Sequence, residues 1–192
     1  MISSFAKWDF KKVFLTIVFS TATFAASFVL GNAITAALGP GMSGLATIII
    51  TTILVVICAK LVEARGVFTI MVTFFTLLAI PTTMFGPPHP LKIVIGVITG
   101  LVYDLTWFIL GKIMRLNKIA LPVAAALSTM VSIISIYFLM KYLIYPKVEY
   151  LRSVLYYIIP VYGILGFIGG AIGESIYNKS LSNMSLIKQL KA

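Results

Sequence analysis

An aspartate flanked by two aromatic residues is the group in this chain best suited to ligand chemistry. Tyr103, Asp104 and Trp107 occur in the apolar stretch "GVITGLVYDLTWFILG", residues 96–111. If this stretch is helical, the three side chains share an arc of about 100° with three of its glycines. A carboxylate between aromatic rings binds a cation or a flat ring, and glycines leave space for one. The pattern predicts a pocket for a small cationic or aromatic molecule.

Asp104 also has a structural interpretation. An ionisable group near the middle of a membrane helix costs at least a few kcal/mol, so it normally faces a cavity or a partner. That partner would be a hydroxyl group of a neighbouring helix, and residues 120–143 supply four candidates. They are Ser128, Thr129, Ser132 and Ser135. A proton relay is a third interpretation, but relays usually need more than one intramembrane ionisable group.

The single histidine of the chain, His89, occurs in the rigid segment "FGPPHP", residues 85–90, and Lys92 follows it closely. Pro90 is suited to a helix start, where its missing N–H group is not needed. The prolines therefore end one helix and begin the next. His89 either contacts a ligand or is a solvated loop residue, and both interpretations remain open.

Composition places these residues in a membrane protein. Hydrophobic residues make up 60% of the 192 residues and charged residues only 10%, against roughly 25% charged residues in soluble proteins. Six apolar runs approach or exceed the ~20 residues that cross a bilayer as a helix. They are residues 13–30, 43–62, 67–85, 91–113, 120–143 and 153–177. An uneven continuation of the first run to Leu38 is left open. The sequence predicts an all-α integral membrane protein with a single domain, residues 1–192, built as a compact bundle of six transmembrane helices.

Charge predicts the topology of this bundle. Alternating the loops between the two sides puts eleven Lys and Arg residues on one side and four on the other. Basic residues concentrate in cytoplasmic loops, so both the N and C termini are expected in the cytoplasm. The basic residues lie in short breaks between apolar runs, which argues against nucleic acid as the partner of this +10 chain.

With both termini in the cytoplasm, three loops are expected on the outer side, at residues 31–41, 85–90 and 145–153, and Asn32 lies in the first. Their Gly, Pro and Tyr content suggests an outward binding mouth, although the tyrosines alone also fit an interfacial aromatic belt. The chain has no GxxxxGK[ST] phosphate loop, and one Cys and one His supply no ordinary metal cluster. We therefore expect no enzyme activity, no bound metal and no cofactor.

Small residues form possible helix-contact surfaces. Ala22 and Ala26 are four positions apart in the first predicted helix, and the stretch "GILGFIGGAIGES", residues 163–175 of the last, contains Gly166, Gly169, Gly170 and Gly173. Small residues at this spacing let helices approach closely. For the last helix we expect internal packing, and the first helix also suits an external partner.

With about 190 residues, six predicted helices, cytoplasmic ends, a basic N-terminal stretch and Ala-x-x-x-Ala in the first helix, the chain resembles the substrate-binding S components of energy-coupling factor (ECF) transporters. The resemblance implies that Ala22 and Ala26 dock a transmembrane coupling protein, and that two cytoplasmic ABC ATPases hydrolyse the ATP. It also implies residence in a prokaryotic cell membrane.

The same resemblance implies a vitamin or other micronutrient captured from outside. The candidate contacts are Asn32, His89, Lys92, Tyr103, Asp104 and Trp107. The acid and the aromatic rings favour a cationic ring compound resembling thiamine. Two rival interpretations stay open: a small membrane assembly subunit without its own ligand, and a stand-alone transporter or channel, which usually shows internal repeats that we do not find here.

Overall fold

The computed structural model describes residues 7–39, 43–144 and 151–182. Within these ranges the chain forms six α-helices and no strand, so the predicted all-α class is confirmed. The helices are α1 (Phe10–Leu38), α2 (Ser43–Val62), α3 (Val67–Leu78), α4 (Lys92–Phe108), α5 (Asn117–Leu139) and α6 (Leu151–Ile176). The π-helical turns η1 (Ile109–Ile113), η2 (Met140–Ile144) and η4 (Tyr177–Leu181) extend α4, α5 and α6.

Four helical segments in the described part of the chain are long and apolar enough to cross a membrane. They are Phe10–Leu38, Lys92–Gly111, Ile119–Tyr142 and Leu155–Leu181. Their outward side chains are apolar, as Val29, Leu105 and Ile164 show with exposed fractions of 65%, 60% and 60%. An apolar outer surface of this kind suits lipid rather than water, so the chain is a membrane protein.

The third predicted span is wrong in its length. The sequence predicts a helix over residues 67–85, but α3 ends at Leu78 after 12 residues, or about 18 Å at 1.5 Å per residue. Residues 79–91 form turns instead. Pro81 cannot donate a helical hydrogen bond and its ring clashes with the preceding turn, so it prevents continuation. Of the two ends that the sequence leaves open for the first helix, the structure has the longer one: residues 31–38, which the sequence also assigns to an outer loop, continue α1 to Leu38.

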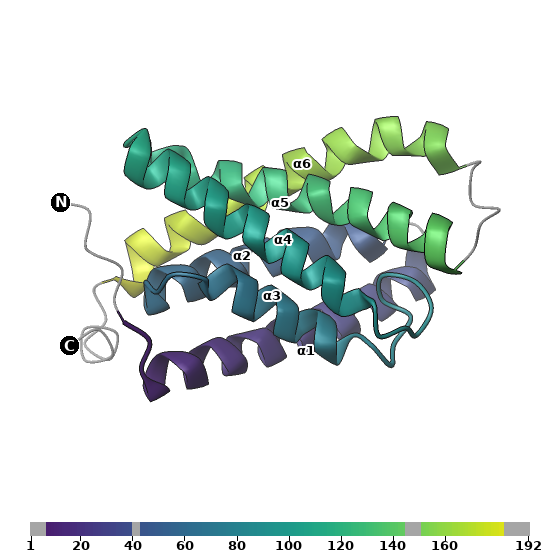
Figure 1. Cartoon of the computed structure of the whole chain (residues 1–192), viewed down its shortest axis with the longest axis horizontal. Helices are drawn as coiled ribbons and strands as arrows, with labels where there is room; N and C mark the ends of the chain where they lie inside the picture. Colours follow the sequence, from purple (N-terminus) through teal and green to yellow (C-terminus); the bar gives the residue numbers. More distant parts are fainter. Residues whose placement is uncertain (1–6, 40–42, 145–150, 183–192) are drawn as a thin grey trace.

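The helices form a closed ring. Each helix packs against two ring neighbours, in the order α1, α2, α6, α5, α4, α3 and back to α1. Chain neighbours α1 and α2, α3 and α4, and α5 and α6 run antiparallel (Figure 1). The start of α1 and the ends of α4 and α6 therefore lie at one end of the bundle.

This end, called the basic end below, carries most of the described cations. They include Lys7, Lys11, Lys12, Lys60, Arg65, Arg115 and Lys179. Lys60 of α2 forms an ion pair of 2.9 Å with Glu174 of α6. The indole Nε1 of Trp8 donates to the carbonyl of Arg65 at 2.8 Å, which fixes the chain before α1 to the loop before α3.

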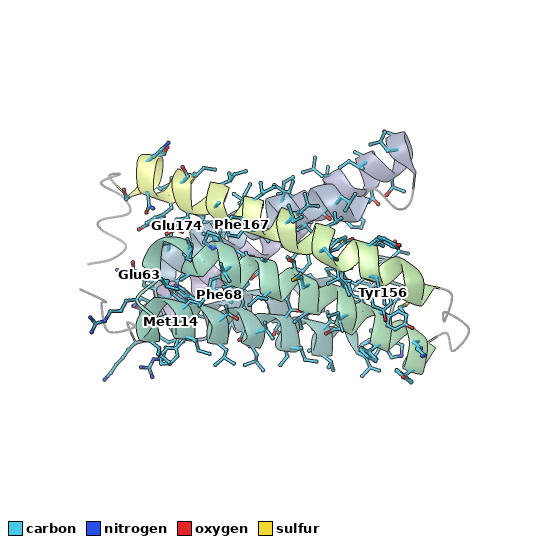
Figure 2. All side chains as sticks on the ribbon, turned by 90° about the horizontal axis from the view of Figure 1, so that it is seen from above. Glu63, Phe68, Met114, Tyr156, Phe167 and Glu174 are labelled. Carbon is cyan, nitrogen blue, oxygen red and sulfur yellow. The ribbon has the colours of Figure 1, made fainter. Side chains whose placement is uncertain are left out.

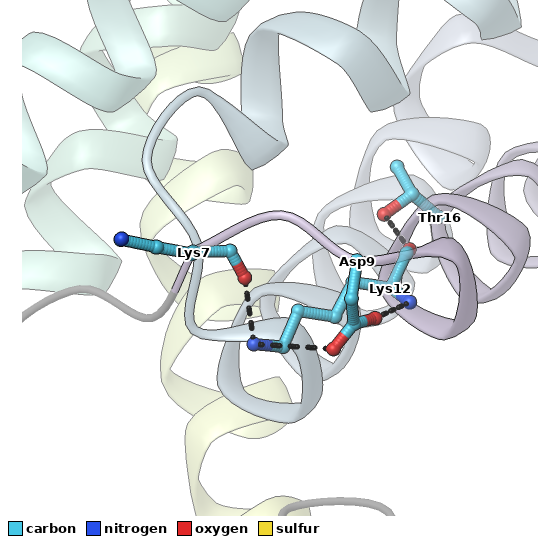
Figure 3. A network of polar contacts seen from close by, with 4 residues as sticks. All are labelled: Lys7, Asp9, Lys12 and Thr16. Carbon is cyan, nitrogen blue, oxygen red and sulfur yellow. Dashed lines mark hydrogen bonds and ion pairs between the residues drawn. The ribbon is translucent and has the colours of Figure 1, made fainter.

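Asp9 caps the start of α1 at the basic end (Figure 3). Its Oδ1 accepts from the backbone N–H of Lys12 at 2.8 Å, which satisfies one of the free donors of the first turn. Lys12 Nζ donates to the carbonyl of Lys7 at 3.0 Å and lies 3.8 Å from Asp9 Oδ2. These contacts define where the first helix begins.

The helix α1 is polar inside and apolar outside. Its buried residues are Thr16, Ser20, Thr23, Ser27 and Gly31. Ser20 Oγ donates to the carbonyl of Met71 at 3.2 Å, and Ser27 and Thr51 share a hydroxyl hydrogen bond of 2.9 Å. Hydroxyl groups on this face therefore attach α1 to α3 and α2 while its apolar face remains on the surface.

Glycines bring α6 close to two neighbours. A Cβ atom at Gly170 would lie 2.9 Å from Cα of Pro122 on α5, and one at Gly173 would lie 2.8 Å from the carbonyl of Ile53 on α2. Side chains there would collide with backbone. The predicted internal packing of the glycine-rich last helix is therefore confirmed.

Several predictions lie outside the described residues. These are the placement of the two chain ends, residues 1–6 and 183–192, part of the first outer loop, residues 40–42, and most of the third, residues 145–150.

Candidate functional site

A cavity of about 450 Å³ lies inside the ring at the end opposite the basic end. We call it the wide chamber. Its walls come from α1, α2, α5, α6 and the loop of residues 83–86. Its polar lining residues are Ser27, Asn32, Thr35, Thr47, Thr83, Thr129, Ser132, Tyr137 and Tyr162. None of the described residues lining it is charged. Its size is that of a small-molecule pocket.

A smaller cavity of about 100 Å³, the deep chamber, adjoins the wide chamber further inside the ring. The two chambers share wall residues Thr47, Ile48, Met84, Phe85, Thr129 and Ser132. The deep chamber is lined by further hydroxyl groups, including those of Thr23, Thr51, Thr52, Thr76, Thr99, Tyr103 and Ser128. Its lining, too, has no charged side chain among the residues that the structure describes.

Stacked aromatic rings separate the deep chamber from the basic end. The rings of Tyr103 and Phe68 are stacked, with centroids 3.8 Å apart and planes 12° apart, and Trp107 meets Phe68 edge-on at 5.4 Å. Tyr103 and Phe68 are 2% and 1% exposed. In Figure 2, Phe68 lies toward the end marked by Glu63, and Tyr156 lies toward the opposite end. We call these three rings the aromatic floor; of them, Tyr103 lines the deep chamber.

The loop of residues 79–91 folds inward to form one wall. Lys92 is fully buried, and its Nζ donates to the carbonyls of Thr82 at 2.7 Å and Ala79 at 3.1 Å. Phe85 packs against Phe75 of α3 with ring centroids 5.8 Å apart. Gly86 has a φ of 101°, which glycine adopts without strain. Non-helical backbone at membrane depth is tolerated where it is buried in protein or lines a cavity.

Asp104 is bound by α3 rather than by the cavity. Its Oδ2 accepts from the backbone N–H of Thr69 at 2.8 Å and from Thr69 Oγ1 at 2.6 Å. Thr69 lies in the first turn of α3, where backbone N–H groups have no partner within the helix and the helix dipole favours a negative charge. The carboxylate therefore caps α3 from a neighbouring helix, and it lines neither chamber.

The structural interpretation of Asp104, a hydrogen bond from a hydroxyl of a neighbouring helix, is therefore confirmed. The expected helix is wrong, because the hydroxyl comes from α3 and not from residues 120–143. Of the four residues proposed there, Ser128, Thr129 and Ser132 line the deep chamber instead. The glycine face of α4 does allow close approach, but what approaches is helix α3: a Cβ at Gly100 would lie 3.0 Å from the carbonyl of Phe68.

The structure separates the six predicted contact residues. Asn32 lines the wide chamber and Tyr103 the deep chamber. Trp107 belongs to the aromatic floor, outside the lining of both chambers. His89 lies in the loop, where its Nδ1 accepts from the backbone N–H of Leu91 at 3.2 Å and supports the turn into α4. Lys92 binds the same loop through the backbone carbonyls of Ala79 and Thr82.

Sequence reasoning missed most of the lining hydroxyls. Thr99, Tyr137 and Tyr162 are examples, on three different helices. A signal was present, since hydroxyl residues recur at helical spacing, as in Thr99 and Tyr103, but it needs the partner helices to be interpreted. Within the described residues no group of three or more His, Cys, Asp or Glu side chains could hold a metal ion.

The two alanines of the first helix lie outside the ring. Ala22 is exposed and Ala26 is half-buried, on a face of α1 away from its buried hydroxyl stripe. Comparison with protein-family models, with curated proteins and with solved structures finds no match to this chain. The chambers and the outer face of α1 are therefore the observations on which a function can be argued.

Proposed function

We propose that the chain is the substrate-capture subunit, or S component, of an ECF-type importer in a prokaryotic cell membrane. The observation that carries the proposal is the cavity, whose two chambers are lined by residues of all six helices and lie away from the basic end. Basic residues mark the cytoplasmic side of a membrane protein. On that rule the cavity faces outward, and both chain ends are cytoplasmic.

In this proposal the chain crosses the membrane six times. Helix α3, with about 18 Å of length, makes the third crossing together with the loop of residues 79–91, which lines the cavity. A solute binds in the chambers from outside and cannot pass the aromatic floor in this conformation. Movement inward therefore needs a second conformation, which a partner supplies.

The partner in this proposal is a transmembrane coupling protein that contacts α1 around Ala22 and Ala26. Small exposed residues on a membrane helix allow another helix to approach its backbone. Two cytoplasmic ABC ATPases bound to the coupling protein supply the energy. Because these separate subunits hydrolyse the ATP, this chain needs no phosphate loop, and its sequence contains none.

The test is purification of the full chain in mild detergent from its native host, with proteins and extracted small molecules identified together by mass spectrometry. We expect a stoichiometric small solute, a coupling protein and ABC ATPases. An empty protein bound to an unrelated membrane complex would overturn the proposal and favour the assembly-subunit interpretation.

A further inference from the structure

We infer that the deep chamber binds the uncharged, hydrogen-bonding end of a ligand whose body occupies the wide chamber. The inference rests on the proposed function only in treating the ligand as a transported solute. The chemical class is a small neutral molecule with a hydroxyl, carbonyl or amide group at one end.

Two unpartnered hydroxyl groups in the chamber wall carry the inference. Among the described residues, Thr99 Oγ1 and Tyr103 Oη are buried and have no hydrogen-bond partner. Thr99 is 7% and Tyr103 2% exposed, and both line the deep chamber. A buried hydroxyl without a partner has lost its hydrogen bonds to water, so a ligand group that pairs with both hydroxyls recovers this cost on binding.

The two residues that carry these hydroxyls lie on one side of α4. Thr99 and Tyr103 are four residues apart on α4 and therefore point to the same side of the helix. The ring of Tyr103 is held by its stack on Phe68. A chamber of about 100 Å³ that both residues line suits one polar group rather than a whole molecule.

Charge in the surroundings excludes an ionic end group. The described residues lining both chambers are neutral. Asp104 and Lys92, the charged residues of α4, are engaged by Thr69 and by the carbonyls of Ala79 and Thr82. Glu174 of α6, whose charge also acts on Tyr103, is paired with Lys60 at 2.9 Å. An ion in the deep chamber would lose its hydration without gaining a counter-ion. This differs from the cationic compound expected from the sequence, because the carboxylate that suggested it is bound by Thr69.

The chemical test uses thiol-reactive probes on the full chain in detergent. Cys58 is first replaced by Cys58→Ala, and cysteines are introduced one at a time by Thr99→Cys, Thr35→Cys and Thr73→Cys. A thiolate attacks the sulfenyl sulfur of a methanethiosulfonate, which forms a disulfide and releases methanesulfinate. The probes are the neutral methyl reagent, the cationic trimethylammonioethyl reagent and the anionic sulfonatoethyl reagent.

Thr35 lines the wide chamber, so reaction at position 35 corrects for the intrinsic reactivity of each probe. Relative to position 35, we expect the neutral probe to react at position 99 at least about tenfold faster than either charged probe, which corresponds to ~1.4 kcal/mol. Position 73 is the matched control, since Thr73 Oγ1 is buried and unpartnered but lies outside the lining of both chambers. The inference would be overturned if charged and neutral probes reacted at position 99 with equal relative rates, or if no probe reacted there. It would also be overturned if the neutral probe reacted at position 73 as fast as at position 99.

A second comparison tests hydrogen bonding. Hydroxyethyl and propyl methanethiosulfonates are neutral and nearly equal in size, and only the first carries a hydroxyl. We expect Tyr103→Phe to slow the hydroxyethyl reagent at position 99 severalfold and to leave the propyl reagent unchanged; an equal effect on both would contradict the inference. If Tyr103→Phe affects both reagents equally while solute and ATPases still co-purify with the chain, the inference is wrong and the proposed function stands. If only the hydroxyethyl reagent is slowed but those partners do not co-purify, the deep chamber still binds a neutral group and the importer proposal is wrong.

Discussion

Lys92 and Asp104 lie on α4 at opposite ends of α3. Asp104 binds the first turn of α3 through Thr69, and Lys92 binds the carbonyls of Ala79 and Thr82 just beyond its last turn. The two residues are twelve positions apart, and α3 has 12 residues, so the antiparallel helices place one charge at each end. The negative charge meets the positive end of the α3 dipole and the positive charge its negative end.

Because Asp104 caps α3 and lines neither chamber, substitution of Asp104 should lower the stability of the protein and leave solute binding unchanged. Asp104→Leu leaves the N–H and hydroxyl of Thr69 without an acceptor and should lower the free energy of unfolding by about 2–3 kcal/mol. Asp104→Asn keeps one acceptor oxygen and should cost only about 1 kcal/mol. Titration with SDS in detergent micelles measures both. Unchanged stability together with lost solute binding in Asp104→Asn would return Asp104 to the role of a ligand contact.

The buried amine of Lys92 predicts control of the cavity wall. Lys92→Met releases the carbonyls of Ala79 and Thr82, so the loop of residues 79–91 should open more often. Hydrogen exchange measured by mass spectrometry should rise severalfold in peptides of this loop and remain unchanged in α5. Lys141→Met is the control, since Lys141 lies in the turn η2 after α5, where its Nζ is 5.2 Å from the ring centroid of Tyr142. Equal protection in Lys92→Met and the unmodified chain would contradict the account.

The contact between α3 and α4 predicts a position-specific glycine requirement. A Cβ at Gly100 would press on the backbone of Phe68 and Thr69, whereas a Cβ at Gly163 would meet only the flexible side chain of Met130. Gly100→Ala should destabilise the protein by about 1–3 kcal/mol through overpacking. Gly163→Ala should be nearly neutral, because Met130 can move. Similar losses for both variants in SDS titrations would show that the two helix contacts are equally tight.

The exposed face of α1 predicts a partner contact separate from ligand binding. Ala22→Leu adds bulk where the coupling protein is proposed to approach, so co-purification of that protein should fall at least severalfold. Thr21→Leu is the matched control, because Thr21 is also exposed but lies about 100° around the helix. Solute bound per chain should remain unchanged in both variants. Partner loss in Thr21→Leu and none in Ala22→Leu would place the contact on another face.

The helices could be predicted from the sequence because each one coincides with an apolar run whose length can be counted directly. It overran α3 because residues 79–85 are as apolar as a helix, although Pro81 signalled an end there. It assigned Asp104 to a ligand because a single sequence does not show which helix end lies beside a carboxylate. The pairing with Lys92 becomes visible only when α3 and α4 are known to be adjacent and antiparallel.

The cavity itself was predicted only in part. Asn32 and Tyr103 were identified as contacts, but Thr99 and Ser132 were not singled out as contacts, since a hydroxyl residue in a membrane helix also bonds to its own backbone. Thr52 does this through the carbonyl of Ile48 at 2.8 Å. Distinguishing such a hydroxyl from a lining one needs the positions of all neighbouring helices.

The most direct test of the central claim is the amount of small solute that co-purifies with the chain when the cavity is blocked. Ser132 lines both chambers, so Ser132→Phe fills the passage between them. Leu101→Phe adds similar bulk on the outer surface, where Leu101 is 54% exposed. Quantitative mass spectrometry should find one solute per chain in the unmodified protein and in Leu101→Phe, and almost none in Ser132→Phe. Equal solute in all three proteins would contradict binding in the cavity.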